Sequence, residues 1–166
     1  MEFKLITEKS ISLIPNVTKV KGYLKSGEVV IFENHMQLLG LIFNNKVEIE
    51  TSDDGSGRKN GNYCFALQDG VFIVSNAVLK NGLKKTFIYA YAKASCDINT
   101  EDSYAEILAR YREKQELLTC ELKKSERTNV NKSILNPMKN SRILRLKEDV
   151  AFLQSSLKFA EARDKS

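Results

Sequence analysis

Residue types that carry out catalysis or bind metals are scarce in this chain of 166 residues. It contains one histidine, three cysteines and no tryptophan. His35 stands in no known nucleophile context, so we expect no histidine-based triad. Cys64, Cys96 and Cys120 are 32 and 24 residues apart, and these spacings match no zinc or redox motif. The sequence therefore predicts a protein that is not an enzyme and that binds no metal or cofactor.

Long apolar runs are also absent. No run approaches the length of about 18 residues that a membrane-spanning helix needs. Residues 1–9 mix acids with lysines and lack the apolar core of a signal peptide. We therefore expect no membrane partner, and a chain that stays in the compartment where it is made unless a partner carries it out.

Two short patterns resemble chemical sites, and each has a simpler interpretation. Residues 54–61 are rich in glycine but lack the Gly-Lys-Ser/Thr ending of a phosphate-binding loop, which favours an exposed turn. Glu48 and Glu50 lie on one face of a candidate strand and could act as an acid and a base. Exposed carboxylates on a strand are the commoner explanation.

Hydrophobic residues make up 42% of the chain and charged residues 28%, which is typical of a folded protein. In residues 1–98, short apolar runs and turn residues recur at the spacing of an all-β fold. Candidate strands are 2–7, 11–14, 17–24, 28–32, 36–43, 46–51, 63–67, 70–74 and 86–94, with a short helix as the alternative for 36–43 and a helical turn at 75–79. We interpret residues 1–98 as an antiparallel β-sandwich docking domain, and Tyr89 and Tyr91 as part of its core face or of a surface that packs on helices.

The pattern changes in residues 99–166. No glycine or proline occurs between Thr100 and Thr128, and Thr100 can cap a helix. Two series of residues then follow the alternating spacing of three and four that defines a heptad. The first series is Tyr104, Leu108, Tyr111, Gln115, Leu118 and Leu122, and the second is Ile143, Leu146, Val150, Leu153 and Leu157. The chain is therefore predicted to be an α+β protein that ends in two helices, with a connector at about residues 126–141.

Two heptad helices in one chain have two simple arrangements. They fold back on each other as an antiparallel hairpin, or each pairs with copies of itself in an oligomer. An isolated pair of helices buries little surface, so we predict that both series form a homo-oligomer interface. Gln115, the polar member of the first series, is expected to set the register of that interface.

One stretch, Lys123 to Lys147, is strongly basic. It carries eight lysines and arginines against the single acid Glu126, a net charge of +7. Such a charge can bind nucleic acid by releasing counterions from phosphates. The candidate contacts are Lys123, Lys124, Arg127, Arg142, Arg145 and Lys147. No aromatic residue that would stack on bases occurs in this stretch, so a solvated connector is preferred to nucleic acid as a partner.

Residues 69–82 read Asp-Gly-Val-Phe-Ile-Val-Ser-Asn-Ala-Val-Leu-Lys-Asn-Gly, and residues 84–91 read Lys-Lys-Thr-Phe-Ile-Tyr-Ala-Tyr. This stretch resembles the end of a β-sandwich module in the upper-baseplate and tail-fibre proteins of phages of Gram-positive bacteria. In that family, helices that oligomerise follow the module directly. The resemblance implies a virion structural role without catalysis or a cofactor.

The leading hypothesis is therefore a bacteriophage virion structural protein, an adaptor of the baseplate, tail or head fibre. It would be made in the host cytoplasm, oligomerise, and dock on other virion proteins. Two alternatives stay open: a nucleic-acid-binding protein that uses residues 123–147, and a small inhibitor that binds another protein.

Overall fold

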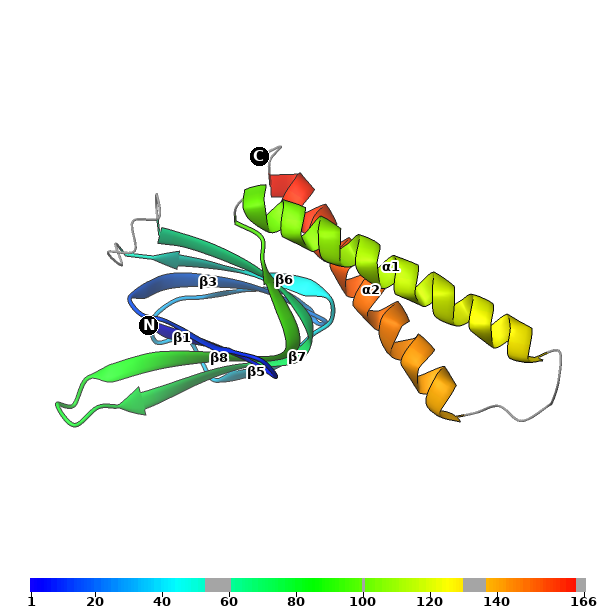
Figure 1. Cartoon of the computed structure of the whole chain (residues 1–166). Helices are drawn as coiled ribbons and strands as arrows, with labels where there is room; N and C mark the ends of the chain where they lie inside the picture. Colours follow the sequence, from blue (N-terminus) through cyan, green and yellow to red (C-terminus); the bar gives the residue numbers. More distant parts are fainter. Residues whose placement is uncertain (53–60, 100, 130–136, 164–166) are drawn as a thin grey trace. The chain divides into compact units, whose positions relative to one another are not determined.

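The computed structural model describes residues 1–52, 61–99, 101–129 and 137–163. The chain divides into two compact units, Met1–Thr100 and Glu101–Ser166 (Figure 1). The described strands belong to the first unit and the two described helices to the second, so the α+β class is confirmed. The predicted division after residue 98 lies close to the boundary at Thr100.

The first unit is a single sheet of eight strands. The strands are β1 (Glu2–Thr7), β2 (Ile11–Ile14), β3 (Val17–Leu24), β4 (Gly27–Ile31), β5 (Leu38–Ile42), β6 (Asn45–Thr51), β7 (Asn62–Val78) and β8 (Lys84–Asp97). Their order is β2-β1-β8-β7-β6-β3-β4, and β5 pairs with β7. β1 runs parallel to β8, and the other pairs are antiparallel. The predicted antiparallel β-sandwich is therefore wrong, because one mixed open sheet takes its place.

The long strand β7 explains how one sheet can enclose a core. Residues 62–67 of β7 pair with β6, residues 70–74 pair with β5 on the same side, and β8 pairs with β7 from Phe65 to Val78. Between the two segments Asp69 has a φ of 31° and is followed by Gly70. The candidate strands 63–67 and 70–74 are therefore two segments of one strand that bends between them. The helical turn predicted at 75–79 is also wrong, since β7 continues to Val78.

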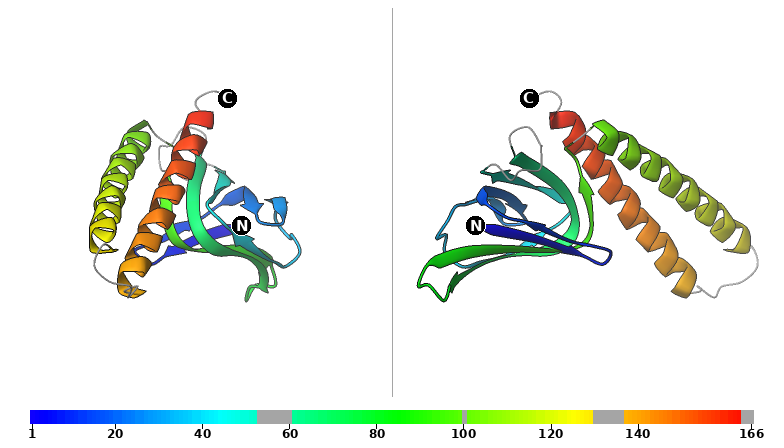
Figure 2. Two further views of the ribbon diagram at one scale, coloured as in Figure 1. Left: turned by 90° about the vertical axis from the view of Figure 1, so that its right-hand side faces the viewer. Right: turned by 60° about the vertical axis from the view of Figure 1, so that its left-hand side comes forward.

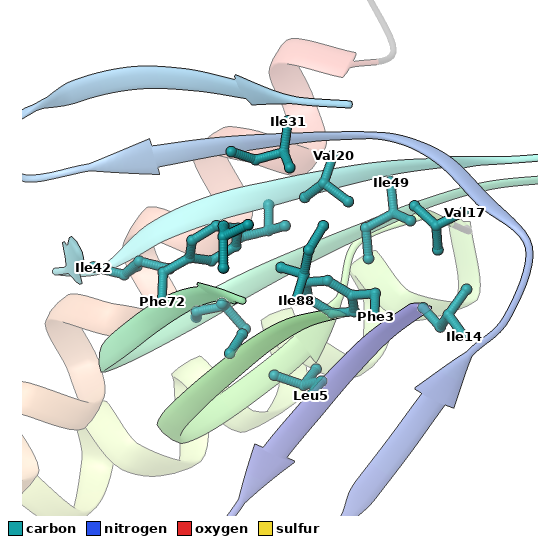
Figure 3. Close-up of a cluster of buried hydrophobic side chains, with 14 of the residues drawn as sticks. Phe3, Leu5, Ile14, Val17, Val20, Ile31, Ile42, Ile49, Phe72 and Ile88 are labelled. Carbon is teal, nitrogen blue, oxygen red and sulfur yellow. The ribbon is translucent and has the colours of Figure 1, made fainter. Parts of the chain in front are cut away.

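The sheet is strongly curved (Figure 2), and the side chains of its inner face are buried. One cross-strand row on this face runs through Leu38, Val74, Ile88, Phe3 and Ile14. Figure 3 shows Phe3, Ile14 and Ile88 among the buried side chains that strands far apart in the sequence contribute to this core. Burial of these apolar groups is the main force that holds the sheet in its curved form.

The second unit is an antiparallel hairpin of α1 (Glu101–Asn129) and α2 (Pro137–Arg163). Its register follows from three side-chain pairs in which the residue number rises along α1 as it falls along α2. These pairs are Tyr104 with Glu161 at 3.0 Å, Lys114 with Asp149 at 2.9 Å, and Glu121 with Arg142 at 3.6 Å. Of the two predicted arrangements, the hairpin is thus present within one chain.

The two helices extend into the predicted connector at 126–141. Residues 126–129 belong to α1 and residues 137–141 to α2, whereas residues 130–136 lie outside the described part of the chain. Thr100, the predicted cap of the first helix, also lies outside the described residues. Neither described helix is long and apolar enough to span a membrane.

Candidate docking surface on the sheet

Apolar side chains cover the outer face of the sheet, opposite the core, across the five neighbouring strands β5, β7, β8, β1 and β2. The strand registers align these residues in two adjacent rows. The first row is Leu39, Ile73, Tyr89, Lys4 and Leu13, and the second is Leu41, Val71, Tyr91, Ile6 and Ile11. We call these ten residues the outer apolar face, and Lys4 is its single charged member.

Several side chains of the outer apolar face are open to solvent. Leu39 is 71% exposed, Ile11 67% and Leu13 56%. Tyr89 and Tyr91 stack at the middle of the face with their ring centroids 6.4 Å apart. Isolated apolar residues are common on protein surfaces, but a continuous set across five strands is characteristic of an interaction site.

The sequence carried a signal for this face that the strand assignments missed. Residues 38–42 and 71–74 are apolar at nearly every position, so each of these segments presents apolar groups on both sides of the sheet. Tyr89 and Tyr91 were expected to belong to the core or to a surface that packs on helices. The core alternative is wrong, because the structure buries Ile88 and Ala90 in the core and turns the two tyrosines outward, and packing on helices stays a prediction.

The other half of the sheet has an outer face of a different kind. Ion pairs join neighbouring strands there: Lys19 with Glu50 at 2.7 Å and Lys21 with Glu28 at 3.1 Å. The side chain of Tyr23, and then Glu28, raise the pKa of Lys21 above its usual value. Charged side chains on this half of the outer face are favourable in contact with water. The two halves therefore differ in polarity, and the outer apolar face is a distinct surface.

On this charged half, Lys46 pairs with Glu48 on the same strand. Burial lowers the pKa of Lys46, but the hydrogen bond to Glu48 and the charge interactions with Glu48, Tyr23 and Cys64 together outweigh it and raise that pKa. Glu48 and Glu50, the candidate acid and base of the sequence, are thus each bound to a lysine. The structure gives these carboxylates the role of ion-pair partners on a solvated strand face.

A polar network ties the loop between β4 and β5 to the hairpin of β7 and β8. The backbone N–H of Thr86 donates to Glu33 at 2.8 Å, and the backbone N–H of Asn34 donates to the Thr86 hydroxyl at 2.9 Å. Thr86 is fully buried, and its hydroxyl donates to Asn76. Sequence reasoning missed this network, because its members are far apart along the chain.

The two predicted helix series lie partly inside the hairpin and partly outside. Leu146, Leu153 and Leu157 of the second series are buried, and Ile143 and Val150 are half-buried. In the first series Tyr104, Leu108, Tyr111 and Leu118 are half-buried, whereas Gln115 and Leu122 are exposed. Ile107, outside both series, is the most buried described side chain of α1. Whether these residues form an interface between copies stays a prediction.

The basic residues of the predicted nucleic-acid site gather at one end of the hairpin. Lys123 and Lys124 lie near the end of α1, and Arg142, Arg145 and Lys147 lie in the first turns of α2. All five are exposed. The antiparallel register brings the two groups together, with Glu121 3.5 Å from Lys124 and 3.6 Å from Arg142. The side chain of Arg127 lies outside the described residues.

The residue types that could carry catalysis are dispersed. His35 contacts the carbonyl oxygen of the next residue, Met36, at 2.7 Å through its Nδ1. Cys64 and Cys96 are buried, and Cys120 is exposed. Among the described residues, no group of three or more His, Cys, Asp or Glu side chains has the arrangement of a metal site.

Comparisons with known proteins add no family. No protein-family model matches the chain, and no curated protein matches it significantly. A chain of the Euglena gracilis mitochondrial ATP synthase (OSCP/F1/c-ring in rotational state 1) is 14% identical over 68% of this chain, with a TM-score of 0.45. The match spans 63% of the Euglena chain, which is less than two thirds of its length.

A second solved structure gives a similar result. A chain from the central stalk and c-ring of the Tetrahymena thermophila mitochondrial ATP synthase is 11% identical. That match covers 95% of this chain and 96% of the other, again with a TM-score of 0.45. Scores this low carry no argument about function.

Proposed function

We propose that this chain is a non-catalytic docking subunit of a protein assembly, and that the outer apolar face is the surface on which a partner protein binds. The observation that carries the proposal is the pair of apolar rows across β5, β7, β8, β1 and β2. Five strands at a spacing of about 4.8 Å span about 19 Å, which is wide enough for the centre of a protein interface.

The physical reason lies in the cost of leaving such a surface in water. Each apolar side chain that a partner covers contributes about 25 cal/mol per Å² of buried apolar area. Rigid strands also hold these side chains in place before binding, so little conformational entropy is lost when the partner arrives. Tyr89 and Tyr91 lie at the middle of the face, and aromatic residues are enriched among those that dominate binding energy.

The kind of assembly is a narrower question. The placement in a phage virion rests on the resemblance of residues 69–91, and the mixed open sheet differs from the β-sandwich that this resemblance implies. The identity of the bound partner would show whether the assembly is a phage virion, and a partner enzyme that loses activity on binding would indicate an inhibitor.

The test is affinity capture with the full chain from cells that express it, followed by mass spectrometry. Leu39→Glu places a charge in the outer apolar face, and Leu83→Glu makes the same change at an exposed leucine outside the two rows. We expect one partner to be captured by the unaltered chain and by Leu83→Glu, and to be lost with Leu39→Glu. Capture that is equal for all three proteins, or absent for all three, would rule out docking through this face.

A second candidate function is nucleic-acid binding at the basic end of the helical hairpin. The observation that favours it is the convergence of Lys123 and Lys124 with Arg142 and Arg145 at that end. It predicts retention on DNA or RNA at low salt and steep loss of affinity as salt rises. Charge reversal of Arg142 and Arg145 should abolish the retention, and a chain that passes through a nucleic-acid column at low salt would eliminate this function.

A further inference from the structure

We infer that the partner on the outer apolar face presents a carboxylate to Lys4. This inference rests on the proposed docking function and specifies the chemistry of the partner surface: apolar groups around one aspartate or glutamate. The observation that supports this inference is the position of Lys4 as the single charged residue within the two apolar rows.

The registers place apolar residues on three sides of Lys4, and Glu2 precedes it on the same face of β1. Tyr89 lies beside it on β8, Leu13 lies beside it on β2, and Ile6 follows on the same face of β1. Lys4 is half-buried, and the structure gives it no ion pair with any described residue. The acid nearest along the strand, Glu2, is bound to Lys85 at 2.8 Å. The outer apolar face itself contains no carboxylate.

A partner that covers this face must deal with the Lys4 ammonium. Removing a charged amine from water without a counter-charge is strongly unfavourable. A carboxylate on the partner removes that obstacle and fixes the orientation of the complex, since only one arrangement places it over Lys4. The long aliphatic part of the lysine adds to the apolar contact.

A second copy of this chain does not meet the requirement. A symmetric interface through the outer apolar face would contain two Lys4 side chains and no carboxylate from the two rows, and Glu2, the acid beside Lys4 on β1, is already bound to Lys85. A different protein with an acidic residue in an apolar surface does meet it. Binding to an anionic lipid surface is a separate outcome that the experiment detects.

The experiment combines capture with zero-length cross-linking by a carbodiimide. The reagent activates a carboxylate, the lysine amine attacks it, and an amide forms as the carbodiimide takes up the elements of water and leaves as a urea. We expect peptide mapping to show an amide between Lys4 and an Asp or Glu of the captured protein. Lys4→Arg keeps the charge but lacks the reactive amine, so capture should persist while this amide disappears.

Charge reversal gives the second arm. Lys4→Glu should lower the affinity for the same partner by about tenfold or more, and an Asp or Glu→Lys change at the mapped partner residue should restore it. If Lys4→Glu binds as well as the unaltered chain while Leu39→Glu does not, the docking face stands and the carboxylate is wrong. If Leu39→Glu also binds, the docking function itself fails. Sedimentation with vesicles of anionic phospholipid that Lys4→Glu abolishes would replace the protein partner by a lipid surface and overturn the inference.

Discussion

Gly70 of β7 and Tyr91 of β8 are so close that a β-carbon on Gly70 would lie 2.1 Å from the carbonyl oxygen of Tyr91. The bend of β7 beside Asp69 occurs at this contact. Because of this bend, β5 and β6 pair with the same edge of β7, and one sheet curves around the core. Val71, the residue after Gly70, pairs with Tyr91, and both belong to the outer apolar face.

The first prediction concerns that contact. Gly70→Ala should destabilise the sheet by about 2 kcal/mol or more, because the new methyl group meets backbone atoms that cannot turn aside. Urea denaturation followed by tyrosine fluorescence measures the change. Gly22→Ala is the matched control, since its nearest neighbour is the Val29 side chain at 3.3 Å and that side chain can adjust. Equal stability of the two variants would show that the close approach has no energetic weight.

The second prediction concerns pH. Burial raises the pKa of Glu33, but hydrogen bonds from the amino group of Met1 and from Thr86 outweigh it and lower that pKa below 4.5. A carboxyl group with a lowered pKa stabilises the fold above its usual pKa, and this contribution disappears as the pH falls through the lowered value. Glu33→Gln should therefore lower the melting temperature near neutral pH, and the difference should shrink below about pH 4.

Thermal melts of both proteins across this pH range measure the effect of Glu33→Gln. The exposed Glu8 offers a control, because Glu8→Gln should leave the melting temperature nearly unchanged at every pH. A difference for Glu33→Gln that stays constant down to the acid limit would mean that the carboxylate charge has no part in the network.

The third prediction compares two leucines of α2. Leu157 is buried, whereas Leu144 is 58% exposed. Leu157→Ala should cost about 2–5 kcal/mol because it leaves a cavity, and Leu144→Ala should change the stability by less than about 0.5 kcal/mol. Helical circular dichroism during urea denaturation reports both values. Similar costs for the two variants would contradict the packing of the hairpin.

The fourth prediction tests self-association. The hairpin leaves Leu117, Leu122 and Leu144 exposed, and the helix pattern predicts an oligomer. Light scattering should give a molar mass above that of one chain at low and at high salt, because apolar contacts are little affected by screening. Leu117→Glu with Leu144→Glu should reduce the mass to that of the monomer. A monomer in the unaltered protein would mean that the heptad pattern serves only the hairpin.

A substitution of Leu153 would not test self-association. It is buried within one chain, so Leu153→Asp would destabilise the protomer whether or not an oligomer exists. The exposed leucines separate the two effects, because their substitution leaves the packed side of each helix intact.

The local patterns of the chain predicted most of the elements. Six of the candidate strands, from 2–7 to 46–51, correspond to β1 to β6, and the region without glycine or proline from residue 100 to 128 corresponds to α1. The strand predictions are wrong where turn residues lie inside a strand. Asp69 and Gly70 are turn residues, yet the pairing of β7 with β8 continues past them because thirteen cross-strand pairs outweigh a local preference for a turn.

The helix series show a similar limit. Heptad spacing placed Leu146, Leu153 and Leu157 correctly on the buried side of α2, but it placed Gln115 and Leu122 on a seam from which the hairpin leaves them exposed. The reason is that a two-helix contact buries a narrow stripe whose direction depends on the partner helix. Ile107 lies on that stripe and falls outside the spacing pattern.

The sequence by itself determined the α+β class, the positions of most strands and both helices, and the scarcity of catalytic residue types. These properties depend on spacing along the chain, which local preferences and apolar periodicity set directly. Only the tertiary structure decided that the strands form one mixed sheet, that Lys4 stands among apolar neighbours, and that Glu33 and Thr86 meet. Such relationships join residues far apart in the chain, and the pairing of β1 with β8 depends on the whole core rather than on either segment alone.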